Sequence, residues 1–258
     1  MKPMKHKLLI TYTTGFVLAV AAAQAGPIIS VDLLNASGQA ITGSYGVASL
    51  GTVAAGWNNP VKLYSDINLS YSDASSSTVG FSLTTPSGAY QSYNAAYAGT
   101  PLAGGPDVYG TPTTLTLNNL NANFAGGYWL IAYVGGFNAN NGASISDGTS
   151  TYFYRSDSAP ANPYGSFVQT TQTSNLGVGN NPIAQYAVFG SSSSLLTSDS
   201  LTLTLSTISG GAGGGAIGGF QIIGAPAPAP EPAPAAIVCL GGLGLLVCAR
   251  RHSGKQVN

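Results

Sequence analysis

The chain has 258 residues, of which only 6% are charged, and its formal net charge is zero. The bases lie mostly at the two ends, so the region Gly26–Gly224 has seven Asp against two bases, Lys62 and Arg155, and a net charge of −5. Nucleic-acid binding needs Lys and Arg to replace the counterions of phosphate. This charge balance therefore excludes a nucleic-acid partner.

The first 25 residues have the pattern of a secretory signal. Three Lys precede a largely apolar stretch, Leu8–Ala22, and the small-residue sequence Ala23-Gln24-Ala25 follows it. A basic start, an apolar run and an A-x-A motif in this order are typical of a signal peptide. We expect a signal helix over residues 1–25 and cleavage after Ala25, which makes Gly26 the mature N-terminus. The alternative is a buried helix of a cytosolic domain.

Residues 26–224 are predicted to form one all-β domain, and a region of this size can bury about 70% of its unfolded surface. Apolar residues alternate with Thr in several runs, and a period of two indicates half-buried strands. Gly, Pro, Asn and Ser clusters separate the runs, as turns do. The pattern predicts an antiparallel β-sandwich of jelly-roll type. The expected strands are Ile28–Leu34, Val61–Leu69, Thr78–Thr84, Leu115–Leu117, Tyr128–Val134, Thr151–Arg155, Ser166–Thr171, Ile183–Phe189, Leu201–Leu205 and Ala216–Ile223.

Two stretches of this region resemble known sandwich domains. Gly126–Tyr133 follows Leu115–Leu120 in a pattern that looks like one jelly-roll strand followed by another that lines the concave face. Ala216–Ile223 is similar to the final strand of galactose-binding-like domains and carbohydrate-binding modules. The resemblance implies a jelly-roll sandwich with a glycan as its ligand.

The middle region contains no His and no Cys. Ser-His-Asp and Cys-His nucleophilic sites and His/Cys zinc sites are therefore excluded there. A pair of Asp could still hydrolyse a glycosidic bond, but turn residues surround Asp73, Asp107 and Asp147 and account for them. Gly210–Gly215 lacks the Gly-Lys-Ser/Thr of a phosphate loop. We expect no enzymatic activity and no required cofactor.

Two segments are candidates for binding. Asn138–Asp147 (NANNGASISD) offers oxygen ligands for Ca²⁺, although its single carboxylate and its spacing favour a plain Asn/Gly loop. Trp57 and Asn58 place an aromatic ring beside an amide in a turn-like stretch, and this combination suits a sugar. The alternative is that such rings cover the edges of the core. The same reasoning applies to Tyr90, Tyr93, Tyr97 and Tyr109.

The last 34 residues contain three ordered elements. Ala225–Pro234 (APAPAPEPAP) is a polyproline-type linker, Ala235–Ala249 is apolar throughout, and Arg250 and Arg251 follow it. As a helix the apolar run measures about 22 Å, which is shorter than the ~30 Å hydrocarbon core. Basic residues after such a run stay cytoplasmic. We expect a transmembrane helix and a basic tail over residues 235–258, with the β domain outside the membrane; a permanent anchor is the alternative.

These elements resemble the PEP-CTERM sorting signal of bacterial envelope proteins. The matching residues are Pro230-Glu231-Pro232, the apolar run and the Arg250-Arg251 pair, and Glu231 is the only Glu of the chain. The resemblance implies that a membrane peptidase, exosortase, recognises the tail and removes the helix. It also implies a bacterium that makes exopolysaccharide. Tails of this type are also grouped under an ice-binding-protein heading. That name refers to the tail alone and is no evidence that the protein binds ice.

Three features of the sequence together indicate the class of function: the export signals, the scarcity of charge and the lack of a catalytic constellation. We expect a non-catalytic protein of the cell surface or extracellular matrix, transiently anchored in the membrane, with a structural or adhesive role and exopolysaccharide as its candidate partner. The alternative is a carbohydrate-binding module with a defined glycan site. A hydrolase is the third possibility.

Overall fold

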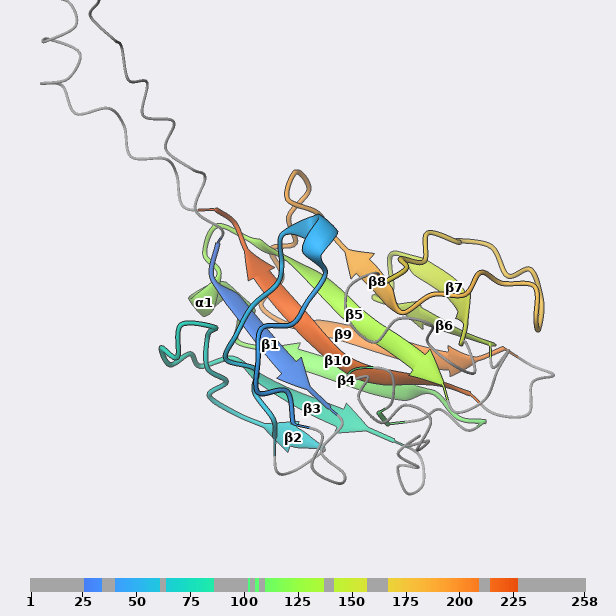
Figure 1. Cartoon of the computed structure of the whole chain (residues 1–258), viewed down its shortest axis with the longest axis horizontal. Coiled ribbons are helices and arrows are strands. Elements are labelled where there is room, and N and C mark those ends of the chain that lie inside the picture. Colours follow the sequence, from blue (N-terminus) through green and yellow to red (C-terminus); the bar gives the residue numbers. More distant parts are fainter. Residues whose placement is uncertain are drawn as a thin grey trace, which may run out of the picture. The chain divides into compact units, whose positions relative to one another are not determined.

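The computed structural model describes residues 26–33, 40–60, 64–85, 102, 105–106, 110–136, 142–156, 167–208 and 214–226. They lie within the unit Ala25–Ala227. Two antiparallel sheets make up nearly all of the regular structure in these ranges (Figure 1). The only helical elements among them are a 3₁₀ turn, η1 (Ala48–Leu50), and a single α-helical turn, α1 (Leu120–Asn123). The predicted all-β class is confirmed.

The two sheets differ in size and in the order of their strands. The four-stranded sheet contains, in order, β1 (Ile28–Asp32), β10 (Gly215–Gly224), β5 (Tyr128–Gly136) and β8 (Tyr186–Phe189). The six-stranded sheet contains, in order, β2 (Ser65–Asp66), β3 (Gly80–Thr84), β4 (Thr113–Asn118), β9 (Leu201–Thr207), β6 (Gly142–Ser146) and β7 (Thr151–Arg155). The first and last strands of the described chain, β1 and β10, are therefore neighbours.

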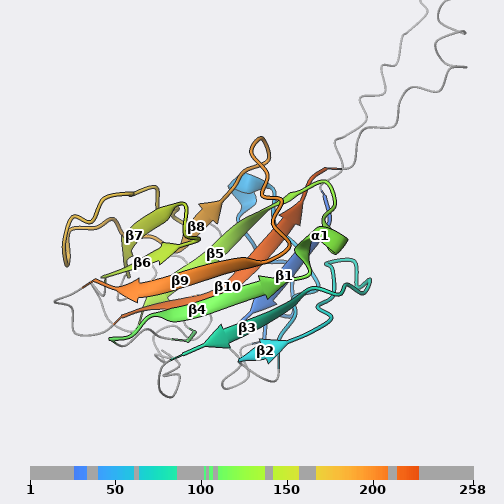
Figure 2. The ribbon, with the colours of Figure 1, turned by 180° about the vertical axis from the view of Figure 1, so that it is seen from behind.

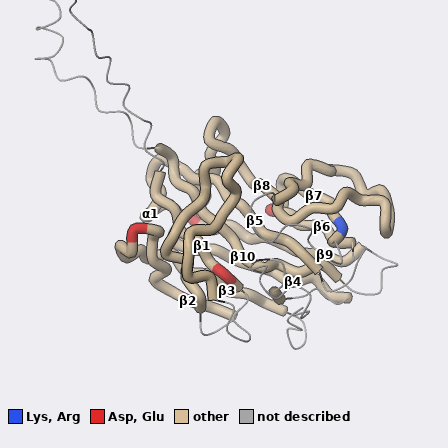
Figure 3. The backbone as a smooth tube through the Cα atoms, in the orientation of Figure 1, with Lys and Arg blue, Asp and Glu red and all other residues tan. Residues whose placement is uncertain are grey.

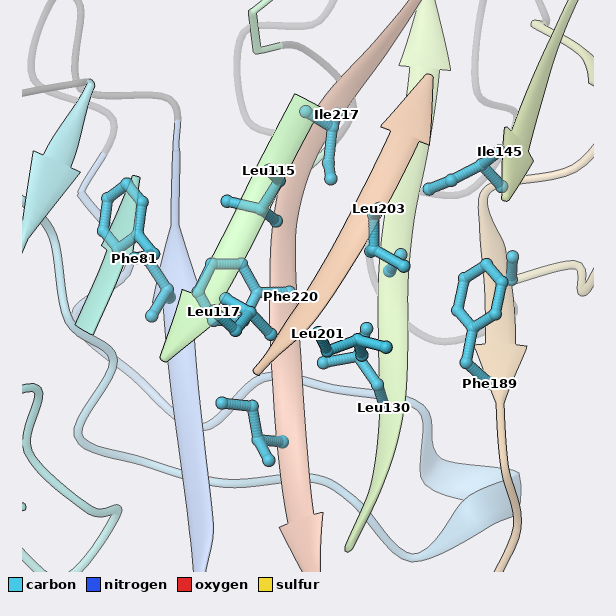
Figure 4. Close-up of a cluster of buried hydrophobic side chains, with 14 of the residues drawn as sticks. Phe81, Leu115, Leu117, Leu130, Ile145, Phe189, Leu201, Leu203, Ile217 and Phe220 are labelled. Carbon is cyan, nitrogen blue, oxygen red and sulfur yellow. The ribbon is translucent and has the colours of Figure 1, made fainter. Parts of the chain in front are cut away.

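One hydrophobic core, here called the central cluster, contains buried side chains of both sheets. Period-two alternation directs Phe81, Leu115 and Leu203 of the six-stranded sheet into it (Figure 4). Phe220 of β10 meets Phe81 edge to face, with ring centroids 5.8 Å apart. Full burial of such a side chain contributes about 1.5–3 kcal/mol to stability.

A second core, the outer cluster, covers the other face of the four-stranded sheet. The irregular segment 40–60 lies over this face and supplies apolar side chains that pack on Ile131 and Tyr133 of β5 and Ile223 of β10 (Figure 1). Both faces of β10 are consequently buried along its whole length. The buried members of the outer cluster are Ile28, Ile41, Tyr45, Val47, Ala54, Trp57, Leu102, Trp129, Ile131, Tyr133, Tyr186 and Ile223.

Most of the expected strands are confirmed, with shifted ends. The structure corrects two of them and adds one that was not expected. Of the expected strand Val61–Leu69 the structure describes residues 64–69; among these, only Ser65–Asp66 forms a strand, and Asn68 has a left-handed φ of 59° that interrupts the pairing. Residues 167–171 make one isolated bridge, between Gln169 and Tyr186, so the strand expected there is wrong. Strand β6 was not expected, because its residues follow an Asn/Gly turn signal; Ala143 and Ile145 nevertheless alternate into the core.

Replacing Phe220 by Ala should show how strongly the two sheets depend on each other. Phe220 is fully buried, so the cavity and the lost contact with Phe81 should lower the free energy of unfolding by about 3–5 kcal/mol. Urea denaturation of both proteins measures this difference. The matched control is Thr202→Ala on the exposed face of β9, for which we expect a change within about 0.5 kcal/mol. Equal effects of the two substitutions would contradict a shared core.

Candidate functional site

Trp57, the candidate for stacking on a sugar, lies inside the outer cluster. Its side chain is 6% exposed, and the indole N–H donates to the carbonyl oxygen of Ala54 at 3.1 Å. Its ring contacts Tyr45 at a centroid distance of 6.2 Å and Tyr133 at 6.0 Å. The structure therefore supports the reading in which this ring covers the core, because the segment 40–60 folds back and buries Trp57 in the outer cluster. No flat face of this ring is open to stack on a sugar.

The side chain of Asn58 binds the backbone of neighbouring segments. Its Nδ2 donates to the carbonyl oxygens of Ser30 and Ser70 at 2.9 and 2.8 Å, and its Oδ1 accepts from the N–H of Ser70 at 2.8 Å. The amide thus ties β1 to the chain just before β3. All of these contacts are internal, so Asn58 has a structural role next to Trp57.

The other predicted site residues lie outside the described residues. These are the cleavage residues Ala23 and Ala25, the sorting residues Pro230, Glu231, Pro232, Arg250 and Arg251, and the four additional Tyr at 90, 93, 97 and 109. The expected membrane helix over residues 235–249 lies outside them as well. Among the described residues, no helix is long and apolar enough to cross a membrane.

Charge is sparse in the part of the chain that the structure describes, where the charged side chains are five Asp and Arg155 (Figure 3). In Asp73, Asp147 and Asp199 a carboxylate oxygen accepts backbone N–H groups of a turn or of α1 at 2.7–3.0 Å. The hydrogen bonds from Ser75 hold the pKa of Asp73 below its usual value. The expected turn roles of Asp73 and Asp147 are therefore confirmed, whereas Asp107 is not described.

The calcium candidate Asn138–Asp147 is only partly described. Its first four residues lie outside the described ranges, and the rest forms β6 and the turn at Asp147. The single carboxylate of the segment is engaged by the N–H groups of Thr149 and Ser150. Within the described ranges, no three His, Cys, Asp or Glu side chains gather where they could hold one metal ion.

A buried polar network, which the sequence did not reveal, lies in the outer cluster. Gln221 of β10 points to this side and is fully buried. Its Oε1 accepts a hydrogen bond from the Tyr133 hydroxyl at 2.6 Å. Its Nε2 donates to the Ser30 hydroxyl at 3.0 Å and to the Thr52 carbonyl oxygen at 2.9 Å. The network therefore joins β1, β5 and β10 to the covering segment, and it satisfies every polar atom of the amide.

The outer side of the six-stranded sheet is a second feature, here called the hydroxyl face (Figure 2). Side chains that point away from the central cluster on β3, β4, β9 and β6 are Thr and Ser, with Asn118 at the end of β4. Across five strands in register, one row contains Thr84, Thr114, Thr204, Ser146 and Thr151. Neighbouring strands are about 4.8 Å apart, so successive hydroxyl-bearing residues of the row are separated by about this distance.

A second row on the hydroxyl face runs parallel to the first. It contains Ser65, Ser82, Thr116 and Thr202, with the hydroxyl oxygens of Thr116 and Thr202 3.1 Å apart. The described charged groups of this sheet are Asp66 in β2 and Arg155 in β7, at its opposite edges. The face is therefore a broad, neutral surface of hydrogen-bonding groups and methyl groups.

The chain has no recognisable relative in three comparisons: no family model matches it, and neither a curated protein nor a solved structure matches it significantly. Its function has to be inferred from the residues and the geometry given above.

The tyrosines of the two cores should make the fold sensitive to alkaline pH. Burial, assisted by the carboxylate of Asp199, raises the pKa of Tyr128 to about 12, and burial raises that of Tyr133 as well. Tyrosines of the unfolded chain ionise near pH 10. Between these values the folded state retains protons that the unfolded state has lost, so stability is fully present below about pH 10 and decreases as pH rises toward 12.

Replacing Tyr133 by Phe tests both the network and this pH dependence. At pH 8 the free energy of unfolding should decrease by about 1–3 kcal/mol, because the Gln221 carbonyl oxygen loses its donor. The decrease of stability above pH 10 should also become shallower, by up to about 1.4 kcal/mol per pH unit for one tyrosine. Urea denaturation from pH 8 to pH 11.5 measures both effects. Tyr64→Phe, at a half-exposed tyrosine, is the control; an identical pH dependence in the two variants would contradict the assignment.

Proposed function

We propose that this chain is an exported, non-catalytic protein of the bacterial cell surface or extracellular matrix, with a structural or adhesive role. In this proposal its two sheets form a β-sandwich of jelly-roll type, flanked by a signal helix and a C-terminal transmembrane helix. An exosortase-type peptidase processes the PEP-CTERM tail, and a neutral polysaccharide of the matrix is the partner of the folded domain.

The observation that carries the proposal is the hydroxyl face. Polysaccharides expose hydroxyl groups, which hydrogen-bond to Ser, Thr and Asn as donors and acceptors. A surface without charge offers no attraction to a polyanion. Two aligned rows of hydroxyls along the sheet suit many weak, repeated contacts with a neutral chain, which is what an adhesive matrix protein requires.

The sorting signals support the destination in this proposal. The tail begins directly after β10, at Ala225, and the expected mature N-terminus Gly26 lies two residues before the start of β1. Between these two signals the sequence therefore supplies one folded unit and little else. The signals determine where the domain goes and carry no information about its activity.

One residue favours the alternative, a carbohydrate-binding module with a defined site. Phe153 of β7 is partly exposed and lies opposite Ser144, so its ring is on the hydroxyl face. An aromatic ring beside hydroxyl groups is the arrangement that binds the apolar face of a sugar. In this alternative the ligand binds around Phe153 alone, and the rest of the hydroxyl face is a solvated surface.

Retention of the purified chain on insoluble neutral polysaccharides tests the proposal. Thr204→Glu places a charge in the middle of the first row and should reduce retention about tenfold or more, equivalent to about 1.4 kcal/mol or more. Thr173→Glu, in an exposed loop, adds the same charge elsewhere and should leave retention unchanged. Phe153→Ala should have a smaller effect than Thr204→Glu.

Each other outcome has a defined meaning. Loss of retention on Phe153→Ala, with Thr204→Glu unaffected, would support the defined site over the distributed surface. No retention of the unmodified chain on any glycan of the panel would refute the polysaccharide partner and leave a structural role. Denaturation curves of the variants show whether each one is folded.

A further inference from the structure

A hydroxyl group and a primary amide face each other in the buried network of the four-stranded sheet. Ser30 of β1 lies directly opposite Gln221 of β10 in the antiparallel register. Both side chains are fully buried, and Gln221 Nε2 is 3.0 Å from Ser30 Oγ. The Tyr133 hydroxyl donates to the Gln221 carbonyl oxygen at 2.6 Å. A nucleophile, an electrophilic carbonyl and a hydrogen-bond donor to its oxygen are therefore in one dry site.

We propose that Ser30 and Gln221 react to form an ester cross-link between the first and last strands of the domain. Ser30 Oγ attacks Cδ of Gln221, the Oγ–Cδ bond forms and the Cδ–Nε2 bond breaks. The nitrogen leaves as ammonia with the hydroxyl proton, so no oxidant, reductant or other reactant is needed. The reaction goes beyond the proposed matrix function and does not rest on it.

The two reacting groups lie within reach of each other. Because Nε2 is bonded to Cδ at about 1.33 Å, Ser30 Oγ lies within about 4.3 Å of the carbon it attacks. Reacting atoms in productive complexes are about 3–3.5 Å apart. Because Nε2–H donates to Oγ, the hydroxyl oxygen lies near the amide plane, so the attack needs a movement of about 1 Å that also brings Oγ over the face of Cδ. The tight register of β1 and β10 holds the two groups together.

The hydrogen bond from Tyr133 acts where negative charge develops. As Oγ adds to Cδ, the amide oxygen becomes an oxyanion, and a donor fixed in a water-free site stabilises it much more than a donor in water does. The burial that raises the pKa of Tyr133 keeps its phenol protonated, and hence able to donate. Tyr133 touches the reacting carbonyl group and is in this sense a catalytic residue.

The surroundings also provide for the proton and protect the product. Asp32 lies two residues from Ser30 on the same side of β1 and is buried; it is the only carboxylate of the four strands. We assign it the transfer of the hydroxyl proton toward the departing nitrogen. Water is excluded from the site, so hydrolysis of the ester is slow, and ammonia that diffuses away makes the step irreversible.

The position of the cross-link gives it a physical consequence. Strand β10 ends at Gly224, directly before the linker that leads to the sorting tail. A pull on that tail acts first on β10, which is joined to β1 and β5 by hydrogen bonds and packing but by no covalent bond across the strands. A covalent bond at Ser30 and Gln221 would keep β1 and β10 together under such a load.

Mass spectrometry of the purified full chain tests the proposal without any substitution. Trypsin cleaves after Lys62 and Arg155, so Ser30 and Gln221 fall on different peptides. We expect these two peptides to remain covalently joined after denaturation, with a combined mass lower by one ammonia. Two separate peptides of full mass would overturn the proposal.

Two controls identify the bond. Ser30→Ala should yield separate peptides, whereas Ser206→Ala on the hydroxyl face should leave them joined. An ammonia lost from either of these two peptides by another route would lower its mass without joining the peptides and would also overturn the proposal. Joined peptides in the Ser30→Ala variant would refute Ser30 as the nucleophile.

Discussion

The double burial of β10 is the constraint on which the rest of the structure depends. Phe220 and Ile222 point into the central cluster, whereas Gln221 and Ile223 point into the outer cluster. Each of its ten residues is buried, so each must suit one of two cores and also leave room for neighbouring strands. Gly219 shows how narrow this room is, because a Cβ atom there would collide with the Val31 backbone and the Leu102 side chain.

The covering segment 40–60 buries the second face of β10, and its own backbone polar groups are satisfied by Asn side chains. It has almost no regular structure, yet its backbone polar groups lie against an apolar sheet and need partners. Asn side chains supply them: Asn59 accepts from the N–H of Ile41 at 3.0 Å and donates to the carbonyl oxygen of Trp57 at 3.0 Å. Asn58 does the same for β1. The residues Trp57, Asn58 and Asn59, which the sequence offered as a sugar site, thus hold the irregular segment 40–60 on the four-stranded sheet.

How much the sequence predicts depends on the range of the interaction involved. The alternation in Leu201–Leu205 is local, and it correctly predicts which side chains of β9 are buried. The exposure of Trp57 depends on how a loop packs against strands far along the chain, which periodicity cannot show. The Gln221 network joins residues 191 positions apart at its most distant hydrogen bond. In the sequence, the only indication that Gln221 is buried is that apolar residues, Phe220 and Ile222, flank it. These neighbours do not identify Ser30 as its hydrogen-bond partner.

The scarcity of charge makes the edges of the sheets important. Many proteins protect edge strands with charged side chains, but the described part of this chain has few to use. Its edges are instead covered by backbone: Asn58 hydrogen-bonds along β1, and Gln172 accepts from the N–H of Phe153 in β7 at 2.8 Å. In the edge strand β8, the carbonyl oxygen of Tyr186 accepts from the N–H of Thr170 at 2.9 Å. The remaining edge strand, β2, has two residues, one of them Asp66. Because the edges are covered or short, the broad hydroxyl face can remain neutral without the sheet extending into a neighbouring molecule.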